Sequence, residues 1–196
     1  MTASPSRKEL SHDRIVTAAA RAIRRGGFEG VGVAHIMKEA GLTHGGFYAH
    51  FSSRNAMLAE AIDRAGQESA ARLTQGIAVR TSRGASDLRA LVEAYLSDRH
   101  LDDIDAGCPV AALASEVPRQ APEVQAASAQ RVHSLLAMVR LALPTDEPAD
   151  SVSVIASQLV GALQLARALG DKAQGRALLK ATRQSLVAQY DRSSLG

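Results

Sequence analysis

The stretch GLTHGGFYAHFSSRNAML, residues 41–58, holds three of the six aromatic residues in a chain of 196. It also places two adjacent glycines, Gly45 and Gly46, inside what otherwise has the pattern of a short helix. Glycine in a helix interior costs about 1 kcal/mol per residue relative to alanine. The pair therefore calls for an explanation other than helix stability.

The residues on either side of this stretch predict two further helices. Apolar residues recur at helical spacing between Ser11, a suitable N-cap, and the Gly26-Gly27 stop. A short helix over about 33–40 then ends at Gly41, and Thr43 is placed to cap a third over about 44–51. Two short helices joined through Gly41-Leu42-Thr43 are typical of a helix-turn-helix.

The third helix has two faces that need different explanations. Phe47 and Phe51 are four residues apart, so they share a face and predict a small core. His44, Gly45 and Tyr48 lie on the opposite face, which that core leaves unexplained. Bare backbone is useful where another surface comes close, and the major groove of DNA admits a helix in this way.

The charge distribution supports an anionic partner for this end of the chain. Residues 1–54 contain eight Lys/Arg and four Asp/Glu, a net +4, and the rest contains fifteen and sixteen, a net −1. The positive excess thus lies wholly in the first quarter of the sequence, as expected where a protein end meets nucleic acid.

These motifs resemble the recognition segment of the TetR family of bacterial transcriptional regulators. The resemblance covers about residues 11–58. The positions of the 41–58 stretch that match the family pattern are Gly41, Leu42, Thr43, Gly45, Phe47, Tyr48, His50, Phe51, Ser53 and Arg54. Upstream, the matches are Ile15, Ala18, Ala19, Gly27, Phe28, Val33 and Ile36.

The resemblance implies that Thr43 and Tyr48 contact phosphates, that the faces of His44, Gly45 and Gly46 meet base edges, and that His50 and Arg54 flank the DNA backbone. Three positions depart from the family pattern. Gly32 stands where Ser or Thr usually caps the second helix, His44 where Lys is common, and Gly46 where relatives often carry a side chain. We therefore expect base recognition to lean on His44 together with Val33 and His35.

The remaining sequence predicts an all-α protein of about nine helices. We expect an N-terminal arm and helix-turn-helix domain over residues 1–52 and a helical effector-binding and dimerisation domain over 53–196. A long helix over 54–77 connects the two. Shorter helices follow, separated by loops at 80–86 and 97–107 and by the break at 144–148.

The last two helices, about 149–169 and 173–190, carry broad apolar faces that need cover on more than one side. In the resembling family such helices form the dimer interface, and a two-fold dimer doubles the base contacts of one small helix. The candidate interface residues are Val152, Ile155, Ala156, Leu159, Leu163, Leu178, Ala181 and Ser185. The alternative is that both helices complete a monomer core.

The middle helices enclose an effector pocket in this family. Its candidate residues here are Tyr95, His100, His133 and Met138, each of which ordinary packing also explains. Few charges occur on these helices' apolar faces, so we expect a largely apolar ligand of a kind the sequence does not specify.

Cys108, the single cysteine, is a candidate sensor. Pro109 suits the first position of a helix, which makes Cys108 the N-cap, where a thiol becomes more reactive. The run GCPVAALASEV resembles a segment in a TetR subgroup with cysteine-based sensing. The alternative is a small residue that fills a turn.

Other function classes find little support. A phosphate loop, zinc spacing and a nucleophile triad are all missing, so we expect no enzyme, no cofactor and no metal. The acidic stretch 98–105 could in principle hold a metal, but a solvated loop is the simpler interpretation. The apolar window 152–169 is interrupted by Gln158, Gln164 and Arg167, which argues against a membrane span. The N-terminus lacks the apolar core of a signal peptide. Both observations favour a cytoplasmic protein.

The sequence thus predicts a ligand- or redox-responsive transcriptional regulator, most simply a repressor. It would bind palindromic operator DNA as a homodimer and release it on binding a small molecule. The alternative is a helical small-molecule or oxidant sensor whose basic end binds a protein.

Overall fold

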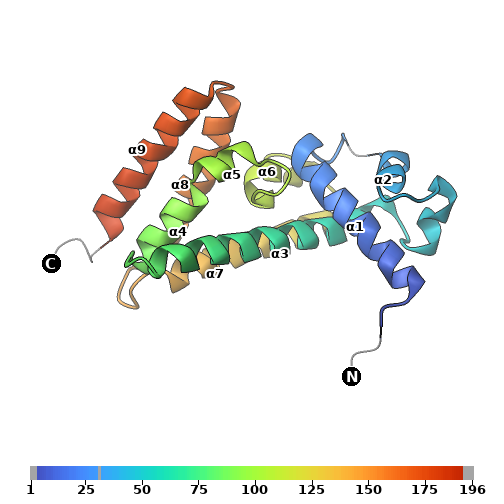
Figure 1. The fold of residues 1–196 in the computed structure, drawn as a ribbon, viewed down its shortest axis with the longest axis horizontal. Coiled ribbons are helices and arrows are strands. Elements are labelled where there is room, and N and C mark those ends of the chain that lie inside the picture. The colour runs from blue at the N-terminus through green and yellow to red at the C-terminus, as the bar shows by residue number, and fades with distance from the viewer. Residues whose placement is uncertain (1–3, 31, 192–196) are drawn as a thin grey trace.

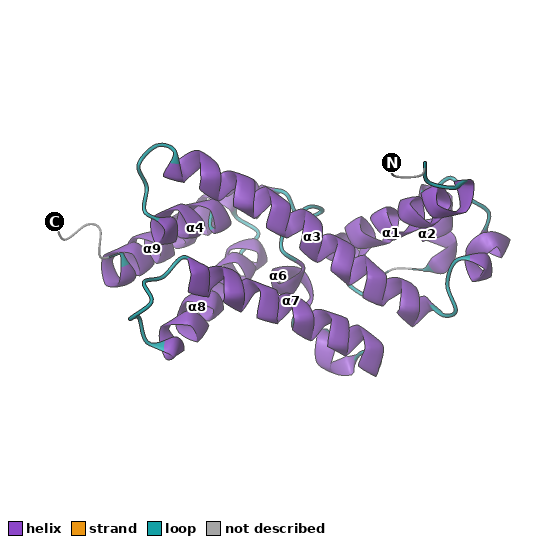
Figure 2. Cartoon of the chain, turned by 90° about the horizontal axis from the view of Figure 1, so that it is seen from below, coloured by secondary structure: helices purple, strands orange, loops and turns teal. Residues whose placement is uncertain are grey.

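The structure is a computed structural model that describes residues 4–30 and 32–191. Those residues form nine α-helices and two 3-10 helices, with no strand among them, which confirms the all-α prediction (Figures 1 and 2). The N-terminal helices lie at one end of an elongated molecule and the last two helices at the other (Figure 1).

The N-terminal end consists of α1 (Arg7–Gly26), α2 (Val33–Glu39) and the 3-10 helix η1 (His44–Ala49). The predicted cap at Ser11 is wrong, because α1 begins four residues earlier. A capping box explains the difference, since Ser6 accepts from the Glu9 N–H and the Glu9 carboxylate accepts from the Ser6 N–H. The polar run 7–10, expected as an arm, is therefore the first turn of a helix.

Helix α3 (Arg54–Thr81) crosses most of the molecule and packs on both ends of it (Figure 1). The Ser53 hydroxyl caps it by accepting from the Ala56 N–H. The helix runs past the predicted end at 77 and stops before Gly84, whose φ of +90° suits glycine. The connecting helix expected at 54–77 is thus present and one turn longer.

The rest of the chain builds the second end of the molecule. The helix expected to begin at Pro109 is short and is followed by a separate 3-10 turn, and the acidic stretch at 97–107 contains a short helix that was expected as a loop. In order, the elements are α4 (Asp87–Tyr95), α5 (Asp98–Asp102), α6 (Pro109–Leu113), η2 (Val117–Arg119), α7 (Pro122–Leu141), α8 (Ala149–Ala168) and α9 (Lys172–Tyr190).

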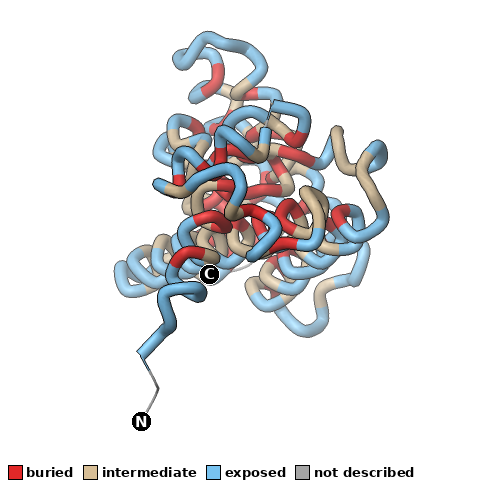
Figure 3. Tube along the Cα trace, turned by 90° about the vertical axis from the view of Figure 1, so that its right-hand side faces the viewer, coloured by how far each residue is buried: buried red, intermediate tan, exposed pale blue. Residues whose placement is uncertain are grey.

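Buried apolar residues form two clusters along α3. Figure 3 shows buried positions towards the interior and exposed ones around them. The first gathers side chains of α1, α2, η1 and the first half of α3 around Phe28, Phe47 and Phe51. The second gathers α4 to α9 around Tyr95. Two residues from beyond α3, Leu113 and Val124, belong to the first cluster, so the two ends of the molecule interlock rather than merely meet.

One helix, α8, is long and apolar enough to cross a membrane by length and composition, with a mean hydropathy of 1.2 over its most apolar window. Three of its side chains, Ile155, Leu159 and Leu163, are fully enclosed in the second cluster. A helix that builds the core of a folded protein passes the same test, so the pattern is weak support for a span.

Candidate nucleic-acid interface

The turn between α2 and η1 is built as the sequence predicts. Gly41 has a φ of +70°, and its N–H donates to the Lys38 carbonyl at 3.0 Å. The Leu42 N–H then donates to the Met37 carbonyl at 2.8 Å, and the Leu42 side chain packs on the first cluster. A residue with a side chain at position 41 would be strained, so this glycine fixes the angle between the two helices.

The two faces of η1 separate as expected. Phe47 and Phe51 are buried, with ring centroids 5.5 Å apart in a stacked arrangement. Tyr48 is 76% exposed, and His44 and Gly45 are exposed beside it. A Cβ added at Gly45 would meet nothing within 4 Å, so the backbone there is open on its outer side. The exposed face thus offers a phenol, an imidazole and bare backbone together.

Two local expectations for this segment are wrong. The segment is a 3-10 helix rather than an α-helix, and it ends at Ala49. Thr43 occupies the N-cap position, but its hydroxyl makes no capping hydrogen bond and remains exposed. Adjacent glycines with low helix propensity favour a short, tight turn over a regular helix. Because it caps no helix, the Thr43 hydroxyl can donate a hydrogen bond to an acceptor on a binding partner.

The predicted contacts on α2 divide between surface and core. His35 is exposed, with its Nε2 atom 3.4 Å from the Glu39 carboxylate. Val33 is only half-buried and packs partly against the first cluster. Gly32 is the N-cap of α2, as the sequence places it, and supplies no side-chain cap. Of the α2 candidates, His35 is thus the freer to meet a ligand.

His50 and Arg54 are more closely tied to the protein than predicted. The Arg54 guanidinium donates to the Phe28 carbonyl and is half-buried, so its first role in the unbound chain is to hold the α1–α2 junction. His50 is half-buried, and its Nδ1 atom is enclosed without a partner among the described residues. Burial lowers the pKa of His50, and the nearby charges of His12 and Lys8 add to the effect.

The basic residues of this end differ in how far they are already neutralised. Arg24 is buried and pairs with Glu68 at 2.7 Å, and Arg25 lies near Glu39 and Asp105. Among the described residues of this end, those basic side chains for which no ion pair is found are Arg7, Lys8, Arg14, Arg21 and Lys38. These charges remain to attract a polyanion.

One carboxylate adds a polar link between this end and the rest of the protein. Glu116, between α6 and η2, accepts a hydrogen bond from the Phe28 N–H at 2.9 Å. Its oxygen would lie 2.4 Å from a Cβ at Gly27, whose φ is +71°, so only glycine fits there. A displacement of the α6–η2 segment would therefore be transmitted through Glu116 to the residues that precede α2.

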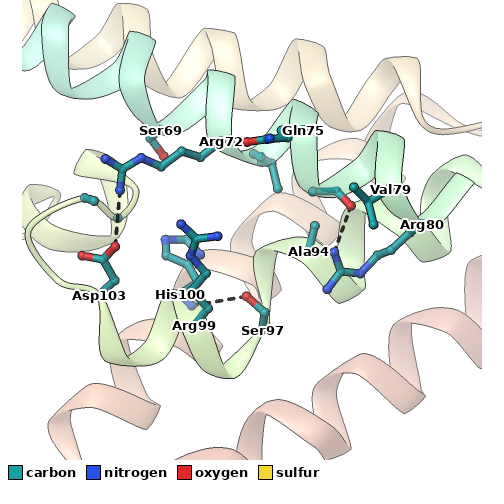
Figure 4. Close-up of a pocket in the computed structure, with 14 residues that line it drawn as sticks. Ser69, Arg72, Gln75, Val79, Arg80, Ala94, Ser97, Arg99, His100 and Asp103 are labelled. Atoms are coloured by element: carbon teal, nitrogen blue, oxygen red, sulfur yellow. Dashed lines mark hydrogen bonds and ion pairs between the residues drawn. The ribbon is translucent and has the colours of Figure 1, made fainter. Parts of the chain in front are cut away.

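The predicted pocket residues lie in different places. A cavity of about 390 Å³ lies between α3, α4 and α5, and His100 lines it (Figure 4). Tyr95 is buried beside that cavity, and its ring meets His100 edge-on at 4.9 Å. His133 is exposed on α7, and Met138 packs against the second cluster. Neither lines this cavity, so the prediction for those two gains no support from it.

His100 is held in one protonation state by its surroundings. Its Nδ1 lies 2.6 Å from the Tyr95 carbonyl, and its Nε2 accepts from the Cys108 N–H at 2.9 Å. A nitrogen that accepts carries no proton, so the ring is neutral with its proton on Nδ1. Burial lowers its pKa to about 4, assisted by Arg167 and opposed by the Tyr95 carbonyl and Asp103.

Cys108 is the N-cap of α6, as predicted, and only 6% exposed. Its thiol does not cap the helix, and the cation near it is Arg167 of α8. The Tyr95 hydroxyl faces this thiol without a hydrogen bond of normal geometry. Burial, and then the proximity of Cys108, raises the pKa of Tyr95.

The predicted dimer residues fall on two faces of α8 and α9. Ile155, Leu159 and Leu163 are fully enclosed by their own chain, so the expectation that they touch a partner needs correction. These three residues, together with the buried Val152 and Ala156, pack in the core beneath the exposed side of α8. Of the α9 candidates, Ala181 and Ser185 are exposed and Leu178 is half-buried. Because α8 carries apolar residues on nearly all sides, its sequence does not predict which side faces the core.

Several side chains that line the cavity were missed by sequence reasoning. Arg72 on α3, Arg99 on α5 and Asp103 in the following loop meet there although 27 or more positions separate Arg72 from the others. The acidic carboxylates of 98–105 are paired with basic side chains, for example Asp102 with Lys172 at 2.9 Å. Within the described ranges, no group of three potential metal ligands occurs.

Comparison with known proteins gives consistent relatives. The family model described as bacterial regulatory proteins, tetR family, matches residues 15–61. An HTH-type transcriptional regulator of Mycobacterium tuberculosis is 31% identical over 170 residues, which covers 81% of this chain and 85% of the relative.

Solved structures share the fold at lower identity. Escherichia coli NemR in its reduced form is 17% identical with a TM-score of 0.72, covering 90% of this chain and 94% of NemR. A TetR-family regulator from Cytophaga hutchinsonii is 17% identical with a TM-score of 0.73, covering 96% and 98%. A TetR regulator from Legionella pneumophila is 20% identical with a TM-score of 0.74, covering 97% and 100%.

Proposed function

The chain belongs to the TetR family of bacterial transcriptional regulators, and we propose that it is a ligand-responsive repressor that binds a palindromic operator as a homodimer. The observation that carries the proposal is the exposed face of η1. His44 and Gly45 are exposed there, and Tyr48 is 76% exposed although one edge of its ring meets buried Phe47 at 5.2 Å. The edge contact with Phe47 leaves the Tyr48 hydroxyl without an internal role next to open backbone.

The groups on this face suit different parts of a duplex. The Tyr48 and Thr43 hydroxyls can donate to phosphate oxygens, which sets the register of the helix on the DNA. His44, together with the bare backbone at Gly45 and the half-buried Gly46, can approach base edges in the major groove. Sequence preference then depends on His44 and on His35 of α2, which lies exposed nearby in sequence.

The test is a fluorescence-anisotropy titration with duplex DNA from immediately upstream of the gene. Tyr48→Ala should weaken binding at least tenfold, whereas Tyr190→Phe, at the far end of the molecule, should not. Affinity should also fall steeply between low and moderate salt, because several phosphate contacts release counterions. Binding that ignores both Tyr48 and salt would refute the proposal.

The homodimer would form through the exposed sides of α8 and α9, which lie at the end of the molecule away from η1 (Figure 1). On α8 the exposed Val154 and Leu165 share a stripe with Gly161, which has nothing within 4 Å of its added Cβ. On α9 the exposed residues facing out include Ala181 and Ser185. Small side chains flanking large exposed ones favour close helix packing with a second copy.

Effector binding would be transmitted along α3 and through Glu116. Helix α3 lines the cavity with its second half and packs on α1 with its first half. A ligand that shifts α3 or the α6–η2 segment would change the orientation of each helix-turn-helix and hence their separation in the dimer. Operator affinity would fall if the two helix-turn-helix units of the dimer no longer matched the spacing of successive major grooves, about one turn of DNA.

A redox response through Cys108 is a second candidate, favoured by the Arg167 charge and the Tyr95 hydroxyl near the thiol. Cys108→Ser should then abolish release from DNA on treatment with hydrogen peroxide. Unchanged release in that variant would assign the response elsewhere.

A further inference from the structure

The cavity between α3, α4 and α5 has a lining whose charge is not balanced. Three arginines contribute to it: Arg72 and Arg80 from α3, and Arg99 from α5. Figure 4 shows Arg72 extending from α3 towards Asp103, and Arg99 rising from α5 into the space below α3. Cations from two separate helices thus converge on one space.

Two of these arginines already have carboxylate partners. Arg72 lies 3.3 Å from Asp103, and Arg80 lies 3.7 Å from Glu93 and donates to the Gly76 carbonyl at 2.9 Å. The exposed side chain of Arg99 forms no ion pair or hydrogen bond within the described part of the chain. One positive charge is therefore left over at the cavity.

No other group at the wall cancels this charge. His100 is neutral because both of its ring nitrogens are engaged, as described above. Behind it, the half-buried Arg167 donates to the His100 carbonyl at 2.6 Å and adds a second cation without a carboxylate partner among the residues described. Arginine in such a position is well suited to a carboxylate or phosphate.

The remaining wall combines the polar side chains of Ser69, Gln75 and Ser97 with a larger share of small apolar ones. Leu73, Val79 and Ala94 contribute apolar surface, and Gly76 leaves room because it carries no side chain. A cavity of about 390 Å³ lies at the small end of the range of roughly 300–1,000 Å³ for ligand sites. The space thus fits a compact apolar body that carries one negative group.

We propose that this cavity binds a small organic monoanion, with Arg99 as its main charge partner and Arg72 as the second. The proposal rests on the proposed function, because it names the chemical class of the effector. It departs from the largely apolar ligand that the sequence suggests.

The same geometry explains how an anion would act on DNA binding. The Arg72–Asp103 pair ties α3 to the loop that leads to α6. An anion that engages Arg72 competes with the Asp103 carboxylate for it, so ligand binding loosens this tie. Because α3 leads directly from η1, the loosened helix is free to change the position of the DNA-binding end.

The experiment is isothermal titration of the full chain with 1-naphthoate and octanoate, each compared with its neutral amide. Both acids should bind the wild-type chain at least tenfold more tightly than their amides. Arg99→Gln should weaken acid binding about tenfold, while Asp103→Asn should strengthen it severalfold by removing the competing carboxylate. Arg119→Gln, an exposed arginine of η2 outside the cavity, is the matched control and should bind as wild type.

Opposite effects of the two cavity variants exclude general damage as their cause. Equal binding of acids and amides, or unchanged acid affinity in both cavity variants, would overturn the anion site. The anisotropy titration on the upstream DNA is run beside it. DNA binding without acid preference refutes the anion site alone, and acid preference without DNA binding refutes the regulator.

Discussion

The neutral His100 predicts how the stability of this protein changes with pH. Its folded-state pKa of about 4 lies below the ordinary 6.5, because burial penalises the charged ring. A depressed pKa contributes stability that is present above pH 6.5 and is lost as the pH falls towards 4. The protein should therefore become less stable on mild acidification, before its carboxylates titrate.

The magnitude follows from the two pKa values. Between pH 7 and pH 5 the unfolded chain takes up a proton on this histidine and the folded chain largely does not. Linkage converts that difference into a loss of about 2 kcal/mol in the free energy of unfolding. For a domain that is stable by roughly 5–15 kcal/mol, such a loss is readily measured.

The assay is urea unfolding followed by circular dichroism at pH 7 and pH 5. His100→Asn keeps an N–H for the Tyr95 carbonyl and cannot titrate, so it should be less stable at pH 7 but lose about 2 kcal/mol less on acidification. His133→Asn replaces an exposed histidine of α7 and should keep the wild-type loss. Equal losses in wild type and His100→Asn would refute the reasoning.

Three further predictions concern the DNA-binding end and the dimer. Gly45→Leu should lower operator affinity at least tenfold, measured by anisotropy, without lowering the melting temperature measured by calorimetry, because a Cβ at this position meets nothing in the free protein. Unchanged operator affinity in this variant would show that the DNA binds at another surface. Glu116→Ala should cost about 1–3 kcal/mol in urea unfolding, because the N–H of buried Phe28 loses its partner, and Glu116→Gln should recover most of it. Leu165→Glu should give monomers in sedimentation velocity, whereas Leu10→Glu on α1 should not; a Leu165→Glu dimer would exclude the proposed surface.

The helix-turn-helix could be predicted from the sequence because its constraints are local. Gly41 has to adopt a positive φ, and Phe47 and Phe51 share one face at a spacing of four. Those requirements are visible as residue types at fixed distances along the chain. What the sequence did not reveal is that two adjacent glycines tighten η1 into a 3-10 helix, or that Thr43 leaves its hydroxyl uncapped.

The cavity could not be predicted, because its residues come together only through tertiary packing. Arg72 belongs to the middle of a long helix, and Arg99 and Asp103 lie in a stretch that was expected to be a solvated loop. Arg54 is a related case, since its role at the Phe28 carbonyl depends on a contact across 26 positions. A sequence pattern predicts which residues share a face of one helix, but it does not predict which helices pack against each other.

The same limitation explains the dimer surface. Helix α8 is apolar nearly all round, so its sequence shows no preferred inward side. The structure resolves this by enclosing Ile155, Leu159 and Leu163 completely and leaving Val154 and Leu165 exposed. The packing of α8 against its neighbours, chiefly α9, α7 and α6, decides between those two stripes.

The claim on which the account depends is that the exposed face of η1 enters DNA. Hydrogen–deuterium exchange of the full chain, with and without the upstream duplex, locates that contact directly. The account predicts slower exchange in peptides covering residues 42–50 on addition of the duplex, and no such slowing with Tyr48→Ala. Protection confined to α8, α9 or the cavity helices, with residues 42–50 unchanged, would contradict it.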